Sequence, residues 1–179
     1  EVGIELAELS HLYALFGTQD NRLSKLDLGL AGECNTDVMC ATADRRELAT
    51  STAKIIFQDD GGSIICSGSL INDRDPTQGH HFVTANHCIN DQLAASSIEL
   101  DWLFRSSACN SAIRDPGYTR QTGGAILLST LQGNYDTTLL RLNRAPPTGV
   151  SPAGWDARQP NFGEPVFGVH HPMGDWQKI

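Results

Sequence analysis

The chain has 179 residues, of which 40% are apolar and 19% are charged, and its formal net charge is −8. This length suffices for a globular domain with its own core, and the composition excludes an intrinsically disordered chain. The Lys and Arg residues are scattered and form no basic stripe, so we expect no nucleic-acid partner. No uninterrupted apolar stretch approaches the roughly 20 residues that span a bilayer, so we expect no membrane partner either.

The first residues differ in pattern from the rest of the chain. Apolar residues recur between Ile4 and Phe16, which is typical of a short amphipathic helix or of a strand followed by a turn. Residues 17–33 are rich in turn formers and indicate a linker.

From about residue 51, short β-like runs alternate with clusters of turn residues. β-Branched and aromatic residues populate the runs, and Asp, Gly, Asn and Pro fill the gaps. The predicted strands are residues 51–58, 63–71, 81–85, 97–104, 124–130 and 137–142. Short strands in this arrangement predict an all-β barrel or sandwich. Two prolines at 146–147 end the region, and a further strand-like stretch follows at 165–170.

The most specific local signal is the run T-A-N-H-C at residues 84–88, preceded by C-S-G-S-L-I at residues 66–71. A general-base histidine must sit at a rigid strand end, where its ring is fixed toward a nucleophile. A lone histidine beside a cysteine usually belongs to a packed surface turn. The two runs together favour a catalytic role for His87.

The second signal is the run D-T-T-L-L-R-L at residues 136–142. A triad aspartate accepts the Nδ1–H of the histidine, which fixes the tautomer and stabilises the imidazolium. We expect such an aspartate to be buried at the start of a strand that packs beside the histidine turn. An isolated Asp before a β-run is usually a turn residue or a cap. With His87 49 residues upstream, we predict that Asp136 is its catalytic partner.

These motifs together resemble the trypsin/chymotrypsin-like serine peptidases, and among them most closely the bacterial lysyl endopeptidases. The likeness extends from about Gly29 to the end and includes C-N-x-D-V-x-C at 34–40, A-G-W-D-x-R at 153–158 and V-H-H-P at 169–172. It implies an all-β, trypsin-like double β-barrel, with the first barrel complete and the second only begun. It divides the chain into a propeptide tail and linker (1–28), an N-terminal barrel with His87 and Asp136 (29–145) and the start of a second, incomplete barrel (146–179).

The resemblance implies that the intact protein is a secreted serine endopeptidase, which hydrolyses peptide bonds after lysine with a Ser-His-Asp triad. The serine motif of that family, G-[D/S]-S-G-S-P, does not occur in the 179 residues. We therefore expect an N-terminal fragment that lacks the nucleophilic serine and is inactive alone. Its partners would be protein or peptide substrates, and we expect a monomer with no cofactor and no metal.

Five cysteines, at positions 34, 40, 66, 88 and 109, are too widely spread for a zinc finger and are typical of disulfides in an oxidising compartment. In the family that the chain resembles, the positions of Cys66 and Cys88 are paired, as are those of Cys40 and Cys109. The counterpart of Cys34 bonds to a cysteine near the far end of the domain, so the resemblance leaves Cys34 unpaired here. We expect a secreted protein, extracellular or periplasmic.

Other candidate sites are weaker. We expect Ser67 and Ser69 to pack beneath the site, and Ser151 lies in an imperfect G-x-S-x-G run with a proline after the serine. The histidine pairs 80–81 and 170–171 can each offer only one ligand to a common metal ion, because neighbours on a strand point to opposite faces. Two non-enzymatic alternatives stay open: a protease homologue that binds a partner without cutting it, and a secreted, disulfide-linked structural domain.

Overall fold

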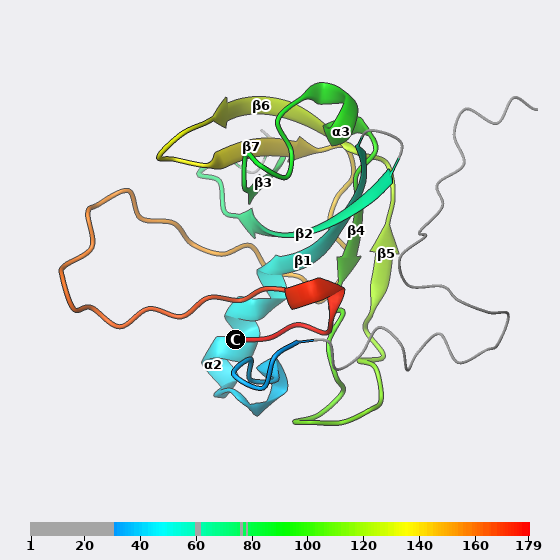
Figure 1. Ribbon diagram of the computed structural model, residues 1–179, viewed down its shortest axis with the longest axis vertical. Coiled ribbons are helices and arrows are strands. Elements are labelled where there is room, and N and C mark those ends of the chain that lie inside the picture. Colours follow the sequence, from blue (N-terminus) through cyan, green and yellow to red (C-terminus); the bar gives the residue numbers. More distant parts are fainter. Residues whose placement is uncertain (1–30, 60–61, 76, 78) are drawn as a thin grey trace, which may run out of the picture.

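The computed structural model describes residues 31–59, 62–75, 77 and 79–179 of the chain (Figure 1). The predicted propeptide tail and linker (1–28) lie outside the described residues. Those described are mostly β, and the strands form one antiparallel sheet of seven in the order β5-β4-β1-β2-β3-β7-β6. No helix in this part of the chain is long and apolar enough to cross a membrane.

The secondary structure consists of short elements. In chain order they are η1 (Val38–Cys40), α2 (Ala43–Leu48), η2 (Ala49–Ser51), β1 (Thr52–Asp59), β2 (Gly62–Ile71), β3 (His80–Thr84), α3 (Gln92–Ser96), β4 (Glu99–Trp102), β5 (Thr119–Gln121), β6 (Ala125–Leu131), β7 (Thr137–Leu142) and η4 (Pro172–Gly174). Six of the seven strands coincide with predicted runs, with ends shifted by a few residues. The exception is β5, which is short and polar and forms a strand only because it pairs with β4.

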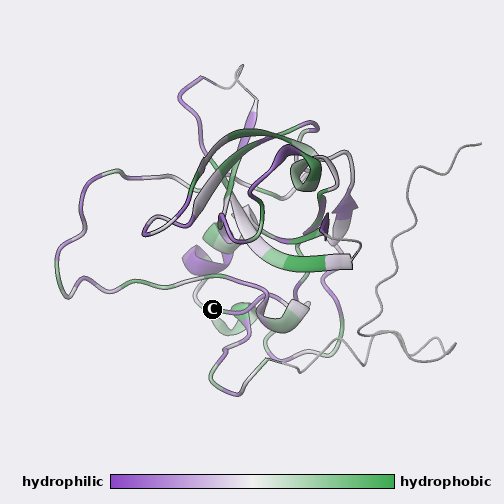
Figure 2. Ribbon diagram, turned by 45° about the horizontal axis from the view of Figure 1, so that its top comes forward, coloured by the Kyte–Doolittle hydropathy of each residue, from purple (hydrophilic) through white to green (hydrophobic). Residues whose placement is uncertain are grey.

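The core lies between the curled strands and α3. Because side chains on a strand alternate between its two faces, Ala53, Ile55 and Phe57 of β1 all point into this core. Phe82 and Trp102 meet edge to face at its centre, with ring centroids 5.9 Å apart. Figure 2 shows hydrophobic residues concentrated on the strands that enclose this core. The apolar patterning of the strands therefore becomes one buried cluster.

The sheet is open, and this corrects the prediction of a complete first barrel. In the described part of the chain, the edge strands β5 and β6 do not pair with each other. A backbone hydrogen bond of 3.2 Å from Gly124 N to Ile98 O does join the residues that precede β6 and β4. The side chain of Gln92 on α3 donates to Ala125 O and accepts from Leu127 N, at 3.0 and 2.9 Å. The edge of β6 is thus satisfied by a side chain instead of by another strand.

Residues 146–179 contain no strand, so the strand predicted at 165–170 is wrong. Figure 1 shows much of this segment (orange) as a long loop that leaves the sheet and returns. It contacts the rest of the fold through single bridges, including Ile71 with Ala153 and Asp37 with Lys178. The apolar run at 165–170 has no neighbouring strand to pair with, and an unpaired run does not form a sheet.

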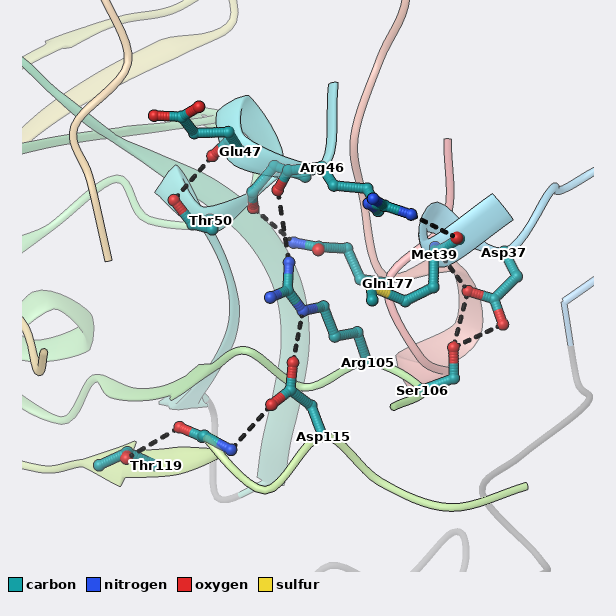
Figure 3. A network of polar contacts seen from close by, with 12 residues as sticks. Asp37, Met39, Arg46, Glu47, Thr50, Arg105, Ser106, Asp115, Thr119 and Gln177 are labelled. Carbon is teal, nitrogen blue, oxygen red and sulfur yellow. Dashed lines mark hydrogen bonds and ion pairs between the residues drawn. The ribbon is translucent and has the colours of Figure 1, made fainter. Parts of the chain in front are cut away.

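Polar contacts hold both described ends of the chain against the sheet (Figure 3). The Asp37 carboxylate accepts hydrogen bonds from the Ser106 hydroxyl at 2.6 Å and from Met39 N at 2.9 Å. Near the other end, the buried side chain of Gln177 donates to Ala49 O at 2.9 Å. Because Gln177 also donates to Thr52 O at 3.0 Å, it helps to hold the start of β1, which follows η2 directly.

Candidate active site

His87 lies in a tight turn directly after β3. The backbone N–H groups of Cys88 and Ile89 both donate to the carbonyl oxygen of Ala85, each at 3.2 Å. A disulfide from Cys88 to Cys66 attaches this turn to β2 and closes a loop with a sequence separation of 22. In the chain-entropy view, such a crosslink stabilises the fold by about 3 kcal/mol. The His87 backbone is therefore held from two directions.

Asp136 meets His87 with both oxygens of its carboxylate. Oδ1 accepts a hydrogen bond from the backbone N–H of His87 at 2.9 Å, and Oδ2 lies 2.7 Å from Nδ1 of the imidazole ring. The hydrogen bond from the His87 backbone, followed by that from its ring, holds the pKa of Asp136 below its ordinary value. An ionised Asp136 favours a hydrogen on Nδ1 of His87, so Nε2 keeps a lone pair that can take a proton.

The exposure of this pair differs from the expectation. Asp136 lies in the turn before β7 at a φ of 35°, and its side chain is 47% exposed, whereas we expected a buried residue at the strand start. The side chain of His87 is 72% exposed. Two hydrogen bonds, and not burial, direct the carboxylate to the histidine. The structure thus brings both predicted residues together, but on an open surface.

No hydroxyl or thiol of the described residues forms a hydrogen bond with His87. Ser67 Oγ accepts from His171 N at 2.8 Å, and Ser69 Oγ lies 2.9 Å from the Thr52 hydroxyl. Ser151 lies in an exposed loop, where its backbone N–H donates to a threonine hydroxyl at 3.2 Å. These three serines therefore make other contacts, and His87 has no hydrogen-bonded hydroxyl or thiol within this part of the chain.

The structure contains the cysteine pairs that the resemblance implied. Cys66 is bonded to Cys88 and Cys40 to Cys109, while Cys34 is a free, exposed thiol. The ligand atoms of Cys66, Cys88 and His87 gather within 4.8 Å of one another. Both sulfurs belong to the disulfide, so neither is a thiolate that could bind a metal ion.

The paired histidines make separate contacts. His81 Nδ1 lies 2.9 Å from Asp73 Oδ2, and His170 Nε2 lies 3.0 Å from Asn35 Oδ1. His171 is buried, and its Nδ1 lies 3.1 Å from the carbonyl oxygen of Asp175. These partners give each of the three a structural role.

A charged cluster, which the sequence analysis missed, crosses the sheet from the buried Lys54 on β1 and Asp101 on β4 to the exposed Arg120 on β5. Lys54 and Asp101 are direct cross-strand partners, with Nζ 3.2 Å from Oδ2. Arg120 donates to both oxygens of Asp101, at 2.7 and 3.0 Å. Burial alone would raise the pKa of Asp101, but the contacts with Arg120 and Lys54 outweigh it and lower that pKa. The available signal was the presence of charged residues, Lys54 and Asp101, inside short apolar runs.

A surface pocket of about 590 Å³ lies where the end of β2 meets the loop at 154–158. Trp155 forms one side of it, and its indole N–H donates to Asn72 O at 2.9 Å. Neither His87 nor Asp136 lines this pocket, so it is separate from the pair.

Comparison with known proteins places these features in a family context. Residues 28–179 match the family described as lysyl endopeptidase, C-terminal domain. A lysyl endopeptidase of Pseudomonas aeruginosa is 35% identical to the chain over 158 residues. That match covers 84% of this chain and 34% of the relative, so the chain spans about a third of the relative's length.

Proposed function

Because the chain belongs to the lysyl endopeptidase C-terminal domain family, we propose that it supplies the histidine and aspartate of a serine-peptidase centre. The 2.7 Å contact between His87 Nδ1 and Asp136 Oδ2 is the observation that supports this most directly. The family and the two disulfides indicate an extracellular or periplasmic protein.

In the whole enzyme, His87 Nε2 would take the proton of a serine hydroxyl while the serine oxygen attacks the peptide carbonyl carbon. The same proton would then pass to the leaving amine, which yields an acyl-enzyme that water hydrolyses. Asp136 would orient the ring and stabilise the imidazolium. From the name of the Pseudomonas relative, we propose protein or peptide substrates cleaved after lysine.

The 179-residue chain by itself is proposed to be inactive as a peptidase, since no nucleophile among its described residues forms a hydrogen bond with His87. In subtilisin, loss of the nucleophile lowers kcat by about 10⁶-fold. A fluorophosphonate probe, which reacts with activated serines, should therefore leave the chain unlabelled, as it should leave a His87→Ala control. Labelling of the chain at a serine, absent from the control, would refute this part of the proposal.

A protease homologue that binds peptides without cutting them is the second candidate. It is favoured by the open surface around His87 and by the lack of a hydrogen-bonded nucleophile within the described residues. For this function, a lysine-containing peptide would bind and remain uncleaved, and both His87→Ala and Asp136→Asn would weaken binding. Isothermal titration with mass spectrometry of the recovered peptide measures both properties.

A small ester distinguishes the two candidates. If His87 is an activated base, the chain should hydrolyse p-nitrophenyl acetate faster than its His87→Ala and Asp136→Asn variants do, because the carboxylate supports the imidazole. Equal rates for all three proteins, together with peptide binding, would favour the binding module.

A further inference from the structure

A row of polar side chains lies beside the His87 turn. Asn86 is buried, and its Nδ2 donates a hydrogen bond to the Thr130 hydroxyl on β6. Thr130 Oγ1 lies 3.0 Å from Oγ1 of Thr138 on β7. Thr138 is fully buried, and its Oγ1 lies 2.6 Å from the carbonyl oxygen of Ile89. The row thus begins one residue before His87 and ends two residues after it.

Thr138 is the donor in both of its contacts within this row. The carbonyl oxygen of Ile89 can only accept, so the one hydroxyl hydrogen of Thr138 points to it. The same hydroxyl also donates to the Thr130 oxygen, at the longer distance of 3.0 Å, so its hydrogen is shared between two acceptors. The Thr130 oxygen in turn accepts from Asn86. The Thr130 oxygen is therefore the acceptor that joins Asn86 to Thr138.

The row connects the two elements that carry the candidate pair. Thr130 and Thr138 are direct partners in the β6–β7 pairing. Asp136 precedes Thr138 by two residues and lies in the turn directly before this strand. The turn that holds His87 is thus attached, through Asn86 at one end and Ile89 at the other, to the strand that follows Asp136.

We propose that Asn86, Thr130 and Thr138 are positioning residues that hold His87 against Asp136. The pair itself is exposed, so little surrounding packing fixes its geometry, whereas Asn86 and Thr138 are buried. A buried donor or acceptor without a partner is costly, which makes the intact row the favoured arrangement. The inference rests on the proposed function for its catalytic meaning, but the positioning is measurable without catalysis.

The test uses isotope-labelled chain and two NMR readouts: hydrogen exchange of the His87 Nδ1–H and the pH titration of the Asp136 carboxyl carbon. Thr130→Val removes the hydroxyl and keeps the shape of the side chain. We expect the exchange to become about tenfold faster, as for the loss of one hydrogen bond, and the pKa of Asp136 to move toward its ordinary value. Thr130→Ser keeps the hydroxyl and should retain both readouts.

Thr119→Val is the matched control, because Thr119 is also an exposed threonine on an edge strand but lies on β5. It should leave both readouts unchanged. Asn86→Ala interrupts the row at its other end and should reproduce the effect of Thr130→Val. Unchanged readouts in a folded Thr130→Val or Asn86→Ala chain would overturn the positioning role and leave the proposed function untouched. Conversely, a chain shown to be a binding module could still give the predicted shifts.

Discussion

The carboxylate of Asp136 binds His87 at two points, one on the backbone and one on the ring. The backbone N–H of His87 occupies Oδ1 at 2.9 Å, and this leaves Oδ2 to face Nδ1 at 2.7 Å. The backbone contact thus fixes the rotation of the carboxyl group at which Oδ2 meets the ring. If asparagine replaced Asp136, the same backbone N–H of His87 would decide which way its amide group faces.

We predict that Asp136→Asn reverses the tautomer of His87. The amide oxygen must accept from the His87 backbone N–H, so the amide N–H₂ faces Nδ1 and donates to it. The ring then carries its hydrogen on Nε2, where it cannot act as a base. Nitrogen-15 shifts of the imidazole report the tautomer directly, and an unchanged Nδ1–H form would contradict the prediction. In a whole enzyme, the comparable change in a trypsin-type triad lowers kcat by about 10⁴-fold.

His171 should make the fold sensitive to acid. Burial disfavours its charged form and lowers its pKa from 6.5 to about 3. Below pH 6.5 the unfolded chain therefore binds a proton that the folded chain does not, and stability falls as the pH falls. The expected loss is about 1.4 kcal/mol per pH unit down to about pH 3.

Urea unfolding at pH 7, 6 and 5 measures this loss. His171→Asn keeps a donor for Asp175 O but has no titrating ring, so its stability should depend less on pH over this range. Parallel pH profiles for the two proteins would show that another group causes the acid sensitivity.

Asp101→Asn should destabilise the fold strongly. The change removes the carboxylate that the buried Lys54 faces inside the sheet, and breaking a buried ion pair costs about 3–5 kcal/mol. Lys54→Met in the same background should recover part of the loss, because it removes the buried ammonium group that faced the carboxylate. Denaturant unfolding of the single and double variants measures both effects. A loss below about 1 kcal/mol for Asp101→Asn would mean that the cluster is relaxed or hydrated.

Removal of the crosslink beside His87 should also lower stability. The double variant Cys66→Ala/Cys88→Ala is expected to lose about 3 kcal/mol, because the unfolded chain regains the freedom of the closed loop. Cys34→Ser is the control, since Cys34 is free and exposed, and its stability should match that of the parent. Denaturant midpoints of the three proteins, measured without reductant, decide the outcome.

The sequence alone was sufficient for the features that depend on neighbouring residues. Alternation and turn clusters predicted the six longer strands, and the two short motifs identified His87 and Asp136, which the structure places in contact. The propeptide tail (1–28) stays a prediction. The strand predicted at 165–170 failed because an apolar run becomes a strand only when another strand pairs with it.

Only the tertiary structure decided how distant segments meet. The Gln92 side chain supplies the hydrogen bonds along the edge of β6. The hydrogen bonds that begin at Asn86 continue through Thr130 on β6 and Thr138 on β7. The burial of Lys54 depends on Asp101 in the facing strand. Local patterns specify the conformation of a segment, because they reflect its own backbone and burial preferences. They do not specify which polar atom lies opposite another, since that depends on the register of strands far apart in the chain.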